Sequence, residues 1–156
     1  VRLFAPKVAD SLEGYRFHQP PELSGAGLVD VTPSGRTDLE VGFRSTSAVG
    51  YQLLGADVTL SRPSGRVLIR GSRVDVEDLR LAAFGGSVQA RFSHRDPRHL
   101  SAELSWTDLA AAELGSAYGF RMKSGGTLTG RLEFEMDEGR VETMLGEGLV
   151  ALEQTE

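Results

Sequence analysis

The sequence predicts a mainly β protein, an antiparallel sheet with one or two short helices. Apolar and polar residues alternate with a period of two from residue 26 onward. Glycine, serine, aspartate and proline interrupt this alternation about every eight to twelve residues, which is typical of strands joined by tight turns. Two short windows show helical character instead. With 156 residues, the chain can form one domain or a segment of a larger array.

The first third of the chain is expected to contain a helix and three strands. Pro6 near the start of the helix and Gly14 after it are typical helix boundaries. The expected elements, in chain order, are a helix over 6–13, a polar glycine-rich loop over 20–27, strands over 27–31, 38–44 and 51–61, and a turn over 62–65.

Alternation is clearest between residues 65 and 92, where three or four strands follow each other with almost no loop and Gly85-Gly86 forms a turn. Successive side chains of a strand point to opposite faces, so the apolar positions can share one side. The polar positions that take the other side are Arg73, Asp75, Glu77, Arg80, Gln89 and Arg91. One face is therefore expected to be apolar and the other solvated.

The last third repeats this order of elements. A strand over 100–106 is followed by a helix over 107–115, capped by Thr107 or Asp108 and ended by Gly115, and then by strands over 128–136 and 146–153. A helix, a glycine-rich loop and strands also follow one another over 6–43. This similarity suggests a module of roughly 90 to 100 residues, with a partial copy over about 1–50 and a main copy over 51–156.

Composition and motifs argue against several classes of protein. The 22 acidic residues exceed the 17 basic ones and no basic run occurs, so nucleic-acid binding is not expected. The absence of cysteine excludes disulfides and thiolate nucleophiles within this chain. No Gly-x-Ser-x-Gly elbow or phosphate-binding loop occurs. The sequence thus predicts a protein that is not an enzyme and has no cofactor.

Two clusters of polar residues could in principle form sites. His94, Asp96 and His99 are close in sequence, but their spacing fits no helical ligand pair, and Pro97 predicts a solvated hairpin turn without a metal. Glu133, Glu135 and Asp137 could suggest the paired carboxylates of a glycosidase. Alternation places them on the solvated side of one strand, about 6 to 7 Å apart.

Residues 65–92, with GRVLIRG, VDVEDLRL and AFGGSVQA, resemble the recurring block of the AsmA family of bacterial envelope proteins, which includes TamB-like relatives. The stretch LSAELSWTDLAAAELG from Leu100 and SGGTLTGRLEF from Ser124 resemble the family's next unit. The similarity covers about residues 50–152. The chain would then be an internal or C-terminal repeat segment of a longer protein.

This resemblance implies a curled antiparallel sheet with an apolar trough, a β-groove. It also implies a periplasmic location, with the full-length protein anchored to the inner membrane through a span missing from this chain. The implied role is phospholipid transport between the inner and outer membranes, or outer-membrane assembly. The expected partners are phospholipid or another acyl-chain lipid, and the sheet edges could support self-association. The residues expected to line the trough are Val67, Ile69, Val74, Val76, Leu79, Leu81, Val88, Ala90, Phe92, Leu104, Leu132 and Phe134.

The alternative is a closed β-sandwich, a structural or adhesion module of a secreted protein. Aromatic residues at apolar strand positions, such as Trp106 and Phe43, usually pack inside a sandwich core. The two hypotheses differ in one structural feature. A sandwich covers its apolar face with a second sheet, whereas a trough leaves that face open.

Overall fold

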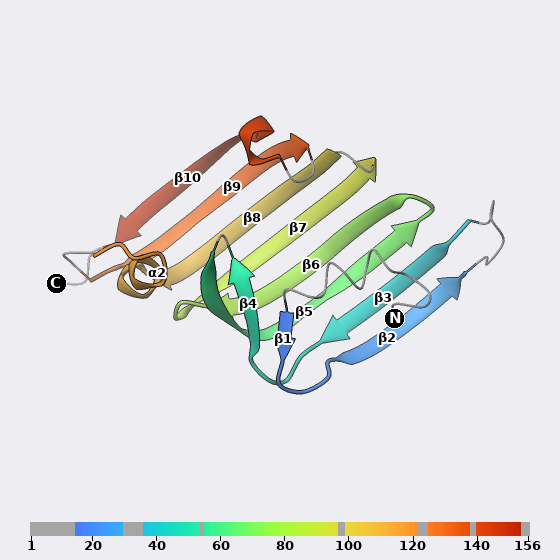
Figure 1. Ribbon diagram of the computed structural model, residues 1–156, viewed down its shortest axis with the longest axis horizontal. Coiled ribbons are helices and arrows are strands. Elements are labelled where there is room, and N and C mark those ends of the chain that lie inside the picture. Colours follow the sequence, from blue (N-terminus) through green and yellow to red (C-terminus); the bar gives the residue numbers. More distant parts are fainter. Residues whose placement is uncertain are drawn as a thin grey trace.

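A curled antiparallel sheet of ten strands dominates the computed structural model (Figure 1). The structure describes residues 15–29, 36–53, 55–96, 99–121, 125–137 and 140–153. Three marginal strands, β1, β2 and β10, each pair on one side only, so the sheet does not close on itself. The predicted mainly β, curled antiparallel fold is therefore confirmed.

The described elements follow the chain with short connections. In order they are β1 (Tyr15–Phe17), β2 (Glu22–Leu28), β3 (Asp38–Arg44), β4 (Val49–Leu53), β5 (Ala56–Arg70), β6 (Arg73–Ala83), β7 (Gly86–Asp96), β8 (His99–Ala110), α2 (Ala111–Ala117), β9 (Thr127–Asp137), the 3₁₀ turn η1 (Val141–Thr143) and β10 (Leu145–Glu153). From β5 onward, each strand pairs with the next in the sequence.

The sheet forks along β5, the longest strand. The first part of β5 pairs with β4, which pairs with β1, whereas its second part pairs with β3, which pairs with β2. The change of partner falls at Arg62 and Pro63, where the register shifts and Arg62 has φ 50°. The predicted turn over 62–65 is therefore wrong. Proline lacks an N–H and is tolerated in a sheet at such an irregularity, so the strand bends without ending.

Two further bulges lie in β6 and β8. In β6 the register shifts between Val76 and Leu79, with Asp78 at φ 52°. In β8 it shifts between Trp106 and Leu109. Each bulge adds one residue to a strand, which bends that strand and increases its twist. In β6 the bulge keeps Val76 and Leu79 on the same face although their sequence separation is odd.

Three further local predictions were wrong. The expected loop over 20–27 is largely strand β2, and the expected strand over 51–61 is the hairpin of β4 and β5. The β6–β7 turn lies at Phe84-Gly85, both with positive φ, instead of Gly85-Gly86. Glycines at alternate positions of β2 concealed its alternation. The predicted helix over 6–13 lies outside the described residues.

The second helix begins later than its sequence predicts. Strand β8 continues through Ala110, which pairs with Thr127 of β9, and α2 starts at Ala111. Ala110 is the N-cap and makes no side-chain capping bond, so neither Thr107 nor Asp108 caps the helix. Instead, the Ala110 N–H donates to the Phe84 carbonyl at 2.7 Å. Pairing with neighbouring strands overrides the helical preference of this segment.

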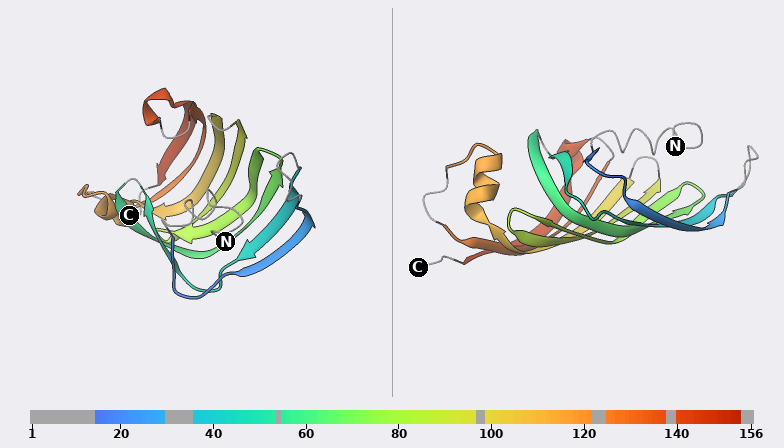
Figure 2. Two further views of the ribbon diagram at one scale, coloured as in Figure 1. Left: turned by 45° about the vertical axis from the view of Figure 1, so that its right-hand side comes forward. Right: turned by 90° about the horizontal axis from the view of Figure 1, so that it is seen from below.

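The buried core lies at one end of the sheet. It comprises Val49, Ala56, Val58, Leu60 and Ala83, with Leu81 and Tyr118 packed against it. Here α2 and the β1–β4 arm rise on the side toward which the sheet curls (Figure 2). The described residues form one forked sheet and no second sheet facing it. The closed β-sandwich is therefore wrong as a fold.

Candidate functional site

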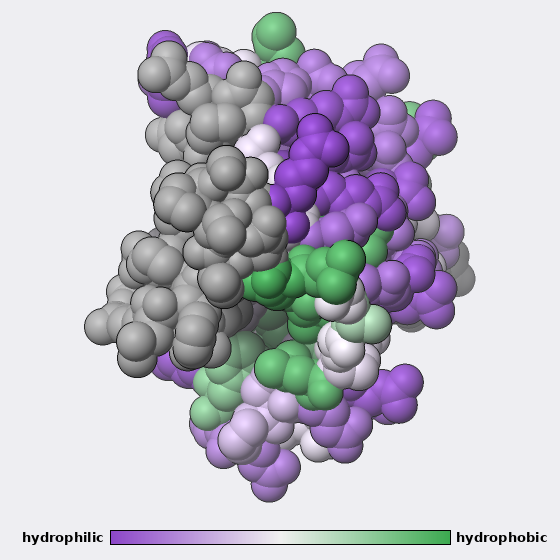
Figure 3. Space-filling view, turned by 90° about the vertical axis from the view of Figure 1, so that its right-hand side faces the viewer, coloured by the Kyte–Doolittle hydropathy of each residue, from purple (hydrophilic) through white to green (hydrophobic). Residues whose placement is uncertain are grey.

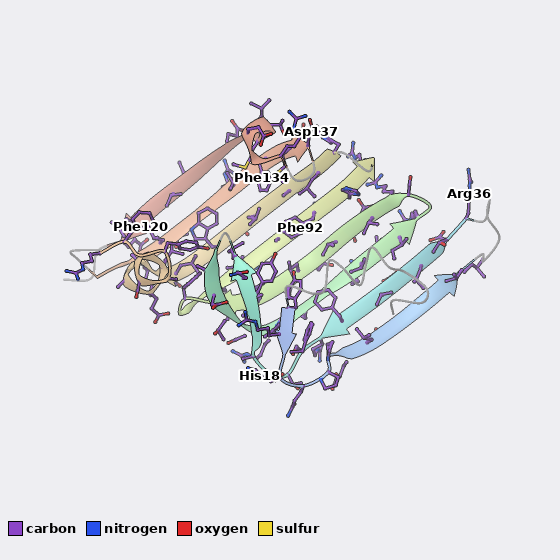
Figure 4. All side chains as sticks on the ribbon, viewed as in Figure 1. His18, Arg36, Phe92, Phe120, Phe134 and Asp137 are labelled. Carbon is purple, nitrogen blue, oxygen red and sulfur yellow. The ribbon has the colours of Figure 1, made fainter. Side chains whose placement is uncertain are left out.

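The candidate site is the apolar face of the curled sheet, which consists of four cross-strand rows. One row runs from Val67 through Val76, Phe92 and Ala102 to Phe134. Figure 4 labels its two phenylalanines, Phe92 on β7 and Phe134 on β9. The other rows are Ile69, Val74, His94, Leu100 and Met136; Leu79, Ala90, Leu104 and Leu132; and Leu81, Val88, Trp106 and Gly130.

These rows contain all twelve residues that the sequence predicted for the trough. Their common face follows from period-two alternation together with the bulge in β6. Each of the twelve is half-buried, and none belongs to the fully buried set. Leu81 alone of the twelve packs against the core cluster. The face is thus covered by α2 and β4 at one end. The role of the twelve residues in binding lipid stays a prediction.

Apolar residues gather in one zone between hydrophilic surfaces when the molecule is viewed from its β2 side (Figure 3). Three aromatic residues that the sequence analysis missed belong to the same side of the fold. Tyr15 stacks on Tyr51 with ring centroids 4.5 Å apart and lies 6.0 Å from Phe17. Burial, and secondarily the charge of Tyr51, raises the pKa of Tyr15. Strand β1 spans three residues, too few for alternation to reveal it.

Trp106 also lies on the apolar face, opposite Val88 and Gly130. Its indole covers Gly130 so closely that a Cβ there would lie 2.6 Å from Cζ2. The tryptophan is half-buried, although its position in an alternating strand suggested plain core packing. As the only tryptophan of the chain, it reports specifically on this face.

The opposite face is charged and carries several ion pairs. Arg66 Nη2 lies 2.7 Å from Asp78 Oδ2 and 3.4 Å from Glu77 Oε2, and Arg66 Nη1 lies 3.6 Å from Glu40 Oε1. The hydrogen bond from Arg66 lowers the pKa of Asp78. Because Asp78 is the bulged residue of β6, this ion pair joins the bulge to β5. Glu40, Arg66 and Asp78 also line a hollow of about 750 Å³ on β2, β3, β5 and β6.

One carboxylate of the charged face is buried. Asp75 is 6% exposed, and its carboxylate accepts hydrogen bonds from Ser93 Oγ at 2.6 Å and Arg73 Nε at 2.7 Å. Burial alone would raise the pKa of Asp75, but the bonds from Ser93 and Arg73 outweigh it and lower the pKa. These contacts join β6 to β7 and give Asp75 a structural role.

Neither a cluster of metal-ligating side chains nor a membrane-spanning helix occurs in the described part of the chain. It contains no group of three or more His, Cys, Asp and Glu side chains able to hold a metal ion. Glu133 and Glu135 are exposed on the charged face, and Glu135 lies 3.7 Å from His99. None of the helices in the described segments has the length and apolar character needed to cross a membrane.

Comparisons of the chain with protein-family models, with curated proteins and with solved structures give no significant match. The resemblance to AsmA-like proteins therefore stays a prediction from the residues quoted above. The site itself combines a half-buried apolar face, a charged opposite face and a cover at one end.

Proposed function

We propose that this chain is a non-enzymatic module that holds the acyl chains of phospholipids against its apolar face. One observation carries the proposal. Twelve apolar side chains from β5 to β9 form continuous rows on one face, yet each stays half-buried. Large contiguous apolar surface on a soluble protein usually marks an interaction site.

The dimensions of the face suit an acyl chain. Between His94 and Val88 the rows extend about 20 Å along β7, at about 3.3 Å per residue. A bilayer has a hydrocarbon core of about 30 Å, so a chain from one leaflet occupies about 15 Å. Burying roughly eight methylenes at about 0.8 kcal/mol each contributes about 6 kcal/mol before the entropic cost of association. Such binding needs no specific polar group.

The proposal extends to the cell envelope through the resemblance to AsmA-like proteins. In a full-length protein anchored to the inner membrane, repeated segments of this kind would line a periplasmic path for phospholipid, or support outer-membrane assembly. The paired charges of the opposite face support such an arrangement, because they keep that side of the sheet in water. Lipid would then contact one face only.

Quenching of Trp106 by brominated phosphatidylcholine tests the binding. Bromine on the acyl chain quenches an indole only at short range, and Trp106 lies on the proposed binding face. We expect saturable quenching by brominated lipid and competition by unlabelled lipid. Mass spectrometry of an organic extract of the purified chain should also detect co-purified phospholipid.

A matched pair of variants tests which face of the sheet binds lipid. Ala90 lies at the centre of the apolar rows, between Leu79 and Leu104, and the adjacent Gln89 points to the charged face. We expect Ala90→Glu to reduce quenching at least severalfold and Gln89→Glu to leave it unchanged. If Ala90→Glu fails to fold, the near-isosteric Val76→Thr and Val88→Thr together replace it. Equal binding by the apolar-face and charged-face variants, or no quenching of the native chain, would refute the proposal.

A further inference from the structure

We propose that two copies of this chain form a closed dimer by pairing their β10 strands edge to edge, antiparallel, about a twofold axis at Leu149. The inference does not depend on lipid binding. It concerns a different part of the molecule, the unpaired margin of the sheet beyond β9.

Strand β10 is a long, largely apolar edge strand without the residues that usually protect such an edge. It pairs with β9 on one side, and Figure 1 shows no described element outside it. All nine residues are exposed, including Leu145 at 79%, Leu149 at 66%, Val150 at 59% and Leu152 at 46%. Proteins usually protect such an edge with proline, lysine or a bulge. Strand β10 has none of these, and its two charges are Glu147 and Glu153.

The residue order in β10 suits pairing with itself. A twofold axis perpendicular to the sheet keeps apolar face beside apolar face. With Leu149 opposite Leu149 of the second copy, Gly148 faces Val150 and Gly146 faces Leu152. Small residues thus oppose large ones. On the charged face Glu147 faces Ala151 and Glu153 faces Leu145, so no glutamate opposes another, which would be destabilising.

Side chains of β9 also lie close to β10 at its two glycines, Gly146 and Gly148. A Cβ at Gly146 would lie 2.6 Å from the Cβ of Phe134, and one at Gly148 would lie 3.1 Å from Cδ1 of Leu132. Leu152 and Val150 of the second copy would approach these same side chains across the glycines. The apolar faces of two copies would then be continuous across the dimer, which adds side-chain contact to the main-chain hydrogen bonds.

The other margins are β1, which has only three residues, and β2, which is the competing edge. It has seven residues against nine in β10, and Leu23 and Leu28 are exposed there. A contact between β2 of one copy and β10 of another is heterologous, so it would add further copies to give a ring or an open fibre. The β10 pairing uses one edge twice and closes with two copies, which is the commonest symmetry of soluble oligomers.

Charge variants at the axis test the dimer. Sedimentation velocity of the 156-residue chain, from micromolar to millimolar concentration, should show a monomer–dimer equilibrium without larger species. Leu149→Lys and Leu149→Glu each bring like charges together and should raise the dissociation constant about tenfold or more. An equimolar mixture of the two variants should restore dimerisation. Leu28→Lys, at an equally exposed site on β2, should have no effect.

Cross-linking tests the register. Because the chain contains no cysteine, a single introduced thiol gives a clean signal. Cysteines at position 149 of the two copies would be about 5 Å apart, whereas cysteines at 145 would be separated by eight residues, about 27 Å. A short bismaleimide should therefore join Leu149→Cys and leave Leu145→Cys as monomer. A monomer at every concentration, open oligomers, loss of dimer in Leu28→Lys, or equal cross-linking at 145 would overturn the proposal.

Discussion

Replacing Gly130 by alanine should strain the contact between the apolar face and β10. Gly130 lies in β9, opposite Trp106 on one side and Val150 on the other. An added Cβ would lie 2.5 Å from the Leu149 carbonyl oxygen and 2.6 Å from Cζ2 of Trp106. Favourable contacts between such atoms need about 3.5 Å. The indole and the β10 backbone must therefore move apart by close to 1 Å.

The expected cost follows from this overlap. Forcing an extra methyl group into a packed site typically costs about 1–3 kcal/mol. Both neighbours resist, because one is a backbone oxygen of a paired strand and the other is a large rigid ring. With an m value of about 2 kcal/mol/M, a loss of about 2 kcal/mol lowers the urea midpoint by about 1 M.

Trp106 provides the assay because it is the chain's only tryptophan. Urea unfolding followed by its fluorescence gives the free energy of unfolding. The native emission spectrum reports displacement of the ring at the same time. Gly125→Ala is the matched control, since a Cβ at Gly125 would meet no heavy atom within 4 Å. Its effect should stay within about 0.5 kcal/mol.

The result that refutes this reasoning is specific. If Gly130→Ala matches the native chain in both midpoint and emission while Gly125→Ala also does, then the indole does not pack on Gly130. If both variants lose the same stability, the effect comes from the backbone and not from the contact.

Three further changes test the core, the buried carboxylate and the helix contact. Changing Val49, which is fully buried at 0% exposure, to alanine should lower the free energy of unfolding by about 2 kcal/mol, measured by urea unfolding. An unchanged urea midpoint would contradict the place of Val49 in the core. Asp75→Asn should lower the free energy of unfolding by about 1–3 kcal/mol at neutral pH. Because the folded pKa of Asp75 is lowered below the unfolded value of about 3.9, its contribution is present above that value and lost as pH falls through the folded pKa. The stability curves of native and variant chains should therefore converge in acid, and a constant gap would count against the ionised contacts. Tyr118→Phe removes the hydroxyl that donates to the Leu53 carbonyl at 3.3 Å, so amide exchange in β4 should accelerate while global stability falls by at most about 1 kcal/mol.

Side-chain alternation, a local property of the sequence, was sufficient to predict most strands of the sheet. Alternation over 65–92 indicated which side chains share a face, and the structure places all twelve predicted trough residues together. Strand β3 and most of β9 and β10 also follow directly from the pattern. Prediction from local sequence failed where pairing with a strand distant in the sequence overrode a residue's usual preference for a turn or a helix. Pro63 sits inside β5, and residues 107–110 extend β8 before the helix begins.

By itself, the sequence determined an antiparallel β protein with one apolar and one charged face, because period-two alternation records which side of a strand meets water. The fork at β5, the bulges at Asp78 and Asp108, and the aromatic residues of the β1–β4 arm were decided only by the tertiary structure. These features depend on pairing between strands far apart in the chain. The same pairing decided that the apolar face curls as a single layer, since an alternating strand has the same pattern in a closed sandwich and in an open trough.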